Sequence, residues 1–276
     1  MPFTGYSLNG IALHDRTRGW AILRAGTNTQ GGITKTLSKA LVPGRPGYRP
    51  GPSTFTEQAL VFVVSCTRDG LDSLLTLCDA ATTLTRTDDP TKVAYVELAS
   101  AIPSGDAPMD ASFEVSITLI AYEGAWRDVA HLSPSLDGSQ STTIGSASQV
   151  LTMAAGISAP ITDMEIFIGG EFNQLTLTDS KGSYIKSARQ FLGTVNHGML
   201  YRGATGEFYQ SLLSSPWVPQ SDASQYFDVS GNGGFRLTPD LVSGNPANRQ
   251  VKLTLTTLQQ TSVTFRIKAK RAYRMN

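Results

Sequence analysis

The chain has 276 residues and a net charge of +1, and charged side chains occupy only 16% of its positions. Hydrophobic residues make up 40%, enough to bury a core, which excludes an intrinsically disordered chain; the length suits one large or two ordinary domains. The nearly balanced charge gives no general attraction to nucleic acid or to an anionic membrane surface.

Other global features point to a mainly β protein made in a reducing cytosol. Uncharged polar residues and glycine take the place of charged ones, which is typical of chains rich in strands and turns. No apolar run approaches the roughly 20 residues of a membrane span. The opening MPFTGYSLNG lacks the basic and apolar regions of a signal peptide. Cys66 and Cys78 are too few for a disulfide framework, so we expect two free thiols.

The first part of the chain predicts a β-sheet domain. Phe113, Val115, Ile117 and Leu119 alternate with polar residues, which is the pattern of a half-buried strand. Residues 59–64 form a continuous apolar run of strand length, which predicts a buried strand. Further strands are expected at 7–13, 19–23 and 92–98, and a polar, Gly-rich stretch occupies 25–39.

One amphipathic helix is predicted over 67–83 and packs on this sheet. Its apolar residues recur at i, i+3, i+4 and i+7, which places them on one helical face. Residues 85–89 break the pattern before Pro90. The residues of the apolar face are Leu71, Leu74, Leu75 and Cys78.

The strongest turn signal is the segment Pro43–Pro52, with four prolines and three glycines. Proline lacks an N–H and fixes its own φ, so the segment is interpreted as an ordered loop extending from a sheet. Arginine makes bidentate contacts with carboxylates, so Arg45, Tyr48 and Arg49 are candidate subunit contacts. The alternative is a solvent-exposed loop without a partner.

The second part of the chain predicts a sandwich of two β-sheets. A polar stretch rich in Ser, Thr and Gly at 128–148 is the best boundary, which gives domains 1–130 and 131–276. Short alternating strands separated by turns are typical of sandwiches. The strands are expected around 163–168, 175–178, 184–186, 251–256 and 263–267.

No motif predicts a catalytic residue, a metal site or a cofactor. Asp163 and Glu165, at i and i+2 of a strand, could serve glycoside hydrolysis, but two charges on a solvated face are the simpler interpretation. His14, His131 and His197 lack the spacing of metal ligands. No nucleophile motif or phosphate-binding glycine loop occurs.

Aromatic residues are frequent in the second part of the chain. Tyr184, Trp217 and Tyr226 are candidate glycan contacts, although core packing explains most aromatics of a sandwich. A basic strand face near the C-terminus is interpreted as a solvated sheet edge, because lysine discourages edge-to-edge pairing. Its residues are Arg266, Lys268, Lys270, Arg271 and Arg274.

Several short motifs follow one another in a characteristic order. Leu-Asn-Gly-Ile at 8–11 is followed by Pro-Gly-Arg-Pro-Gly at 43–47, the apolar strand, the helix and the alternating strand. This block closes on Tyr-Glu-Gly-Ala-Trp at 122–126, and Leu-Thr-Asp-Ser-Lys-Gly-Ser follows at 177–183. The order resembles that of the distal tail proteins of bacteriophages with long, non-contractile tails.

The resemblance implies a β-sandwich or barrel-like domain with one packed helix at 1–130 and a galectin-like β-sandwich at 131–276. The first domain would form a homo-hexameric ring that joins the end of the tail tube to the tip or host-adsorption apparatus. Implied partners are the tail tube, tail tip or hub, and tape measure proteins, and host-surface polysaccharide, without nucleic acid or membrane.

The implied location is the virion tail, after assembly in the cytoplasm of the host bacterium, and the implied role is structural and not enzymatic. Two alternatives stay open: a carbohydrate-binding module, and another ring-forming component of the tail or baseplate.

Overall fold

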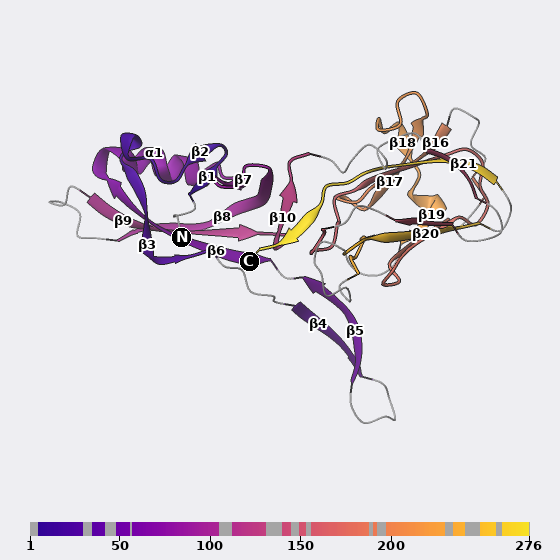
Figure 1. The fold of residues 1–276 in the computed structure, drawn as a ribbon, viewed down its shortest axis with the longest axis horizontal. Coiled ribbons are helices and arrows are strands. Elements are labelled where there is room, and N and C mark those ends of the chain that lie inside the picture. The colour runs from indigo at the N-terminus through magenta and orange to yellow at the C-terminus, as the bar shows by residue number, and fades with distance from the viewer. Residues whose placement is uncertain are drawn as a thin grey trace. The chain divides into compact units, whose positions relative to one another are not determined.

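A computed structural model describes residues 5–29, 35–41, 48–55, 57–104, 112–130, 140–144, 149–152, 156–187, 190–191, 197–229, 234–240, 249–257 and 261–275. Over these residues the protein is mainly β with one α-helix, which confirms the predicted fold class (Figure 1). The chain divides into two compact units: residues 1–129 together with 274–276, and residues 130–273.

The first unit is built on a large sheet whose neighbouring strands are mostly antiparallel. Its strands are β1 (Tyr6–Leu8), β2 (Ile11–Ala12), β3 (Trp20–Asn28), β6 (Gln58–Thr67), β7 (Thr83–Arg86), β8 (Lys92–Ser104), β9 (Ser112–Ala121) and β10 (Ala125–Asp128). The order is β2-β1-β7-β8-β9-β6-β3, and β10 joins through β8. The last strand of the chain, β22 (Ala272–Arg274), contains the boundary at which the chain passes from the second unit back to the first. A short 3-10 helix, η1 (Arg16–Arg18), precedes β3.

Buried and more exposed residues alternate along the strands of this sheet, because successive side chains point to opposite faces. In β9, the four predicted apolar residues are all buried, which confirms the half-buried strand. In β6, Leu60, Phe62 and Val64 are buried, while Val61 and Val63 are only half-buried. The run 59–64 is therefore a strand, as predicted, and its burial is on one face, because only that face of β6 lies against the core.

The single α-helix, α1 (Arg68–Asp79), covers one face of this sheet and packs against β6, β8 and β9. The Thr67 hydroxyl caps it by accepting a hydrogen bond from the Gly70 N–H at 3.3 Å. Leu74, Leu77 and Cys78 are buried, so the buried face is shifted slightly from the predicted one. The predicted extent of 67–83 was too long, because the chain turns into β7 at Thr83.

The turn between β1 and β2 contacts the segment that follows α1. Asn9 and Gly10 form a two-residue hairpin loop, both with positive φ, as an Asn-Gly turn requires. The Asn9 side chain donates to the Ala80 carbonyl at 2.6 Å and accepts from the Thr82 and Thr83 N–H groups at 3.1 and 3.0 Å. The Asn9 side chain thus supplies hydrogen-bond partners for three backbone groups in the segment between α1 and β7.

A two-stranded hairpin lies between β3 and β6 in the chain. It consists of β4 (Lys35–Leu41) and β5 (Tyr48–Phe55), paired from Lys35–Phe55 to Leu41–Tyr48. Within the described residues the two strands pair only with each other. A register shift between Leu37 and Lys39 marks a bulge opposite the proline-containing part of β5.

The second unit contains two antiparallel sheets, as the strand patterns predicted. The first has the order β11-β21-β13-β16-β17-β18, and the second has the order β12-β20-β14-β15-β19. The strands are β11 (Gln140–Ile144), β12 (Gln149–Thr152), β13 (Glu165–Gly169), β14 (Thr176–Asp179), β15 (Tyr184–Ser187), β16 (His197–Arg202), β17 (Glu207–Leu212), β18 (Ser221–Asp222), β19 (Phe227–Val229), β20 (Lys252–Thr256) and β21 (Thr261–Lys268), with a 3-10 helix η2 (Ser224–Tyr226) before β19.

Apolar side chains from both sheets meet in one core. Ile166, Ile168 and Met199 of the six-stranded sheet surround the same small void as Leu177 and Ile185 of the five-stranded sheet. All five are buried. Since these residues point into the core, Glu165 and Phe167 of β13 lie on the opposite, outer face of the six-stranded sheet.

Candidate functional site

The predicted contact loop is in large part a hairpin. Residues 48–52 belong to β5, and the earlier polar stretch contributes to β3 and β4, so the predicted loop 43–52 is too long. Proline is tolerated in β5 because the strand belongs to a two-stranded sheet and has an edge without a ladder partner in the described residues. Tyr48 and Arg49 lie opposite Leu41 and Ala40, whereas Arg45 falls outside the described residues.

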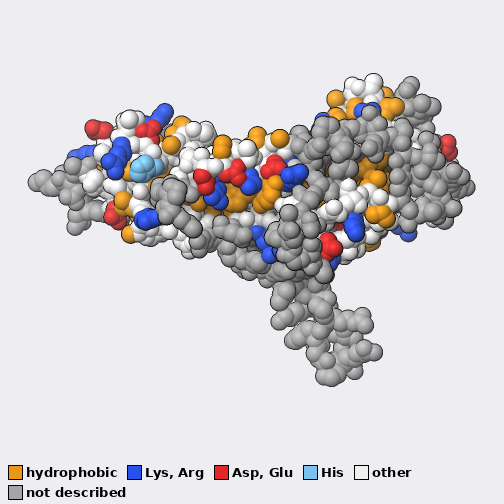
Figure 2. Space-filling model, in the orientation of Figure 1, with side chains coloured by type: hydrophobic (Ala, Val, Ile, Leu, Met, Phe, Trp, Pro, Cys, Tyr) orange, Lys and Arg blue, Asp and Glu red, His pale blue; other side chains and the backbone are white. Residues whose placement is uncertain are grey.

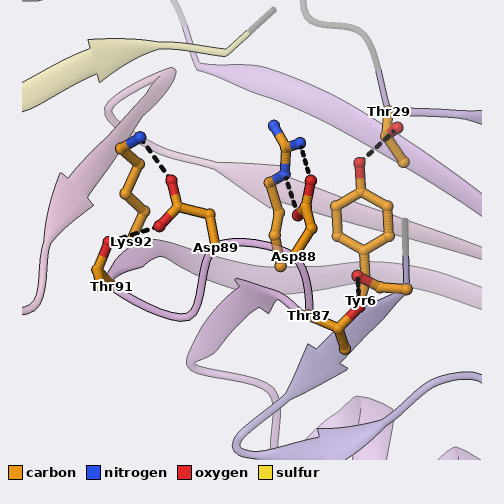
Figure 3. A network of polar contacts seen from close by, with 9 residues as sticks. Tyr6, Thr29, Thr87, Asp88, Asp89, Thr91 and Lys92 are labelled. Atoms are coloured by element: carbon orange, nitrogen blue, oxygen red, sulfur yellow. Dashed lines mark hydrogen bonds and ion pairs between the residues drawn. The ribbon is translucent and has the colours of Figure 1, made fainter. Parts of the chain in front are cut away.

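A network of polar contacts lies along β7, β8 and the turn between them (Figure 3). Arg86 donates to both carboxylate oxygens of Asp88, at 2.9 and 2.6 Å, and these hydrogen bonds raise the pKa of the guanidinium. Lys92 donates to Asp89 at 2.6 Å, and this bond, with that from Thr91, lowers the pKa of the carboxyl group. Charges of this surface are therefore already paired, and Figure 2 shows acidic and basic side chains side by side.

A polar cavity of about 370 Å³ lies at one end of β13, β16 and β21 in the second unit. Asp163 and Glu165 both line it, so the structure brings the predicted carboxylate pair together. Arg202, Lys268 and Lys270 line the same cavity. The carboxylates are therefore surrounded by cations and do not form an isolated acidic pair.

Strand register explains how these charges meet. Glu165 of β13 lies directly opposite Arg202 of β16 on one side and Lys268 of β21 on the other. The Arg202 Nε donates to the Glu165 carboxylate at 3.1 Å, and both side chains are about two-thirds buried, being 35% and 30% exposed. Opposite charges in neighbouring strands stabilise the sheet and fix each other's position.

Trp217 borders this row of charges on the outer face of the sheet. Its ring contacts that of Phe167 edge-to-face, with centroids 6.5 Å apart, and the Lys268 ammonium lies 4.2 Å from the Trp217 centroid. Its carbonyl also accepts a hydrogen bond from Arg202 at 3.4 Å. Phe167 is completely buried although it lies on the outer face, because Trp217 covers it.

The other two glycan candidates lie elsewhere: Tyr184 is on the five-stranded sheet, and Tyr226 is in η2, directly before β19 of that sheet. Tyr184 begins β15, whereas Tyr226 directly precedes Phe227, the β19 residue that pairs with the last residue of β15. The two tyrosines are thus at opposite ends of one strand pair. Tyr226 contacts Phe191 edge-to-face, with centroids 6.3 Å apart. The three predicted glycan contacts therefore do not form one cluster, because Trp217 lies between β17 and β18 of the six-stranded sheet.

The basic C-terminal strand face was misinterpreted as a sheet edge. β21 lies between β11 and β13, so it is an inner strand. The sequence also did not single out Arg202, although the Gly-Ala-Thr-Gly turn after it signals a hairpin that could hold a side chain at a strand end. Its position opposite Glu165 depends on strand order, which a single sequence does not provide.

The two cysteines and the histidines are the remaining candidates for a catalytic or metal-binding role. Cys66 and Cys78 are free and buried, and burial raises the pKa of both thiols, to about 12 for Cys78. Among the described residues, no group of three or more His, Cys, Asp or Glu side chains could hold a metal ion. His131 lies outside the described residues. Over the residues that the structure describes, no helix is long and apolar enough to cross a membrane.

No family model and no curated protein matches this chain. Among solved structures, it is similar to the Dit protein of phage SPP1, described as a paradigm of the hub adsorption apparatus in phages that infect Gram-positive bacteria. The match covers 98% of this chain and 99% of that chain, with a TM-score of 0.50 and 13% identity. The chain has the fold of a phage Dit protein.

Two structures of the phage P2 baseplate in its activated conformation, with Ca and with Sr, are also similar. They match over 98% of both chains, with TM-scores of 0.40 and 0.38 and identities of 12% and 13%. The similarity to the SPP1 protein confirms, at the level of the fold, the resemblance to phage distal tail proteins noted in the sequence.

Proposed function

We propose that this protein is a structural, non-enzymatic component of a bacteriophage tail. Six copies would close into a ring that joins the end of the tail tube to the tip or host-adsorption apparatus. The observation that carries the proposal is the fold shared with SPP1 Dit over nearly the whole of both chains. Fold alone is a weak guide to function, but here the order of the sequence motifs favours the same family.

The first unit would form the ring, and the β4–β5 hairpin would bind the neighbouring subunit. A strand with an unpaired edge is a template for pairing with another chain. Charged and proline residues along the hairpin, such as Lys39 and Pro50, limit indiscriminate pairing and favour one specific neighbour. Arg45, Tyr48 and Arg49 would add side-chain contacts at the hairpin end.

The second unit, with its two antiparallel sheets, would be a galectin-like domain attached to this ring. The proposed protein partners are the tail tube protein, the tail tip or hub protein, and the tape measure protein. Assembly would take place in the cytoplasm of the host bacterium, and the mature location would be the virion tail.

Light scattering after size-exclusion chromatography tests the proposed ring. The 29.5 kDa chain should elute as a species of about six times that mass. Arg45→Ala should shift the population towards monomer while the far-ultraviolet circular dichroism stays unchanged. Arg68→Ala, which removes an exposed arginine at the start of α1, is the matched control and should leave the hexamer intact. Equal masses for all three proteins would show that Arg45 does not contribute to assembly.

A further inference from the structure

The cavity at the end of β13, β16 and β21 has no role in the proposed ring, yet it is built like a binding site. Its volume of about 370 Å³ lies within the range of roughly 300–1,000 Å³ found for small-molecule sites. Three of its five charged side chains, those of Glu165, Arg202 and Lys268, come from neighbouring strands of one sheet, which hold them more rigidly than loops would. The other two, Asp163 and Lys270, lie two residues before β13 and two residues after β21.

The charges of the cavity are partly ordered before any ligand arrives. The ion pair between Arg202 and Glu165 fixes both side chains, and the Arg202 guanidinium is also bonded to the Trp217 carbonyl. Lys268 rests on the Trp217 ring, which limits the motion of its long side chain. A ligand therefore meets groups that have already lost part of their conformational freedom, which lowers the entropic cost of binding.

The lining selects for a hydroxyl-rich ligand that carries negative charge. An apolar ligand would strip water from charged groups without replacing their hydrogen bonds. A simple anion would meet the carboxylates of Asp163 and Glu165, and a simple cation would meet three basic side chains. Hydroxyl groups can donate to the carboxylates, while an acidic group on the same molecule accepts from the excess of cations.

We propose that this cavity binds an acidic saccharide or polyol, with its hydroxyl groups on Asp163 and Glu165 and its carboxylate or phosphate group on Lys268 and Lys270. Thr205, which also lines the cavity, adds a neutral hydrogen-bonding group. The site differs from an aromatic sugar platform, because Lys268 already covers one region of the Trp217 ring. The proposal does not depend on ring formation.

Isothermal titration calorimetry on the full chain tests this site. The probes are trigalacturonate, a glycerol phosphate trimer, neutral galactotriose and inorganic phosphate. Binding of either acidic trimer supports the proposal, and the tighter of the two identifies the acidic group as carboxylate or phosphate. Lys268→Gln and Lys270→Gln should each weaken that binding by roughly 10- to 100-fold, since each variant replaces a hydrogen bond between two charged groups with a weaker neutral one.

Lys252→Gln is the matched control, because Lys252 is an exposed lysine on β20 of the other sheet. It should leave the affinity unchanged. Lys270 lies beyond the end of β21, so its replacement keeps the strand pairing even if the Lys268 variant does not fold. The proposal is overturned if neither acidic trimer binds, if galactotriose or inorganic phosphate binds as tightly, or if both cavity variants retain full affinity.

Discussion

The side-chain oxygen of Asn9 accepts two hydrogen bonds from Thr83, one from its backbone N–H at 3.0 Å and one from its hydroxyl at 3.2 Å. The Asn9 backbone N–H in turn donates to the Thr83 carbonyl at 2.9 Å. These contacts span 74 positions of sequence and tie the first hairpin of the chain to the start of β7. The Asn-Gly pair thus forms a turn, and its Asn9 side chain also binds the carbonyl of Ala80, the residue that follows α1.

Replacing Asn9 with alanine should destabilise the first unit by about 1–2 kcal/mol. The change removes side-chain hydrogen bonds comparable to a helix cap and places alanine at a φ of 47°, which asparagine tolerates better. Asn9→Asp keeps the acceptor oxygen but loses the hydrogen bond to the Ala80 carbonyl, so its stability should lie between those of the native chain and Asn9→Ala. The free energies of unfolding of the three proteins, measured with urea, test this order.

Gln174 provides the control for the backbone conformation. It is the other described non-glycine residue with positive φ, at 50°, and it is exposed. Gln174→Ala should cost less than Asn9→Ala. If both variants lose the same stability, the hydrogen bonds of Asn9 contribute nothing beyond the conformation of its backbone.

Gly203→Ala should destabilise the second unit by about 2–3 kcal/mol, as overpacking does. A Cβ atom at this position would lie 2.0 Å from the Thr162 carbonyl oxygen, which is backbone and cannot move aside cheaply. Gly206→Ala, in the same turn, has a φ of +73° but open space around its Cβ, so it should cost only about 1 kcal/mol. Thermal unfolding compares the two, and equal losses would contradict the steric explanation.

Stability should fall at alkaline pH because of Cys78. Burial raises the pKa of this thiol to about 12, whereas the thiol of the unfolded chain ionises near its ordinary value of 9.0. Since the folded pKa is the higher one, the stabilisation is complete below pH 9 and is lost as the pH rises towards 12. Urea midpoints at pH 8 and pH 10.5 should differ more for the native chain than for Cys78→Ala. Equal pH dependence would contradict this origin.

Local patterns predicted much of the fold. The alternation in β9 and the apolar face of α1 were recognisable because each follows the period of its own element. The two sheets of the second unit also followed from alternating strands and turns. The contact that Asn9 makes with Ala80, the residue that follows α1, was not predictable in this way, because the two residues lie 71 positions apart.

The candidate sites were less predictable, because they depend on which strands become neighbours. The prolines of β5 favoured a loop, yet a two-stranded hairpin accommodates them at an edge. Asp163 and Glu165 were recognisable as a pair, but their cationic neighbours come from β16 and β21. Lys268 appeared to mark an edge only because the flanking strands β11 and β13 lie far from β21 in the sequence.

Negative-stain electron microscopy of the purified full chain shows directly whether the protein forms the proposed ring. We expect closed rings whose averaged top views show six-fold symmetry, and fewer such rings for Arg45→Ala than for Arg68→Ala. Particles that remain single subunits at the highest concentration, or rings with a different symmetry, would contradict the proposed hexameric tail component.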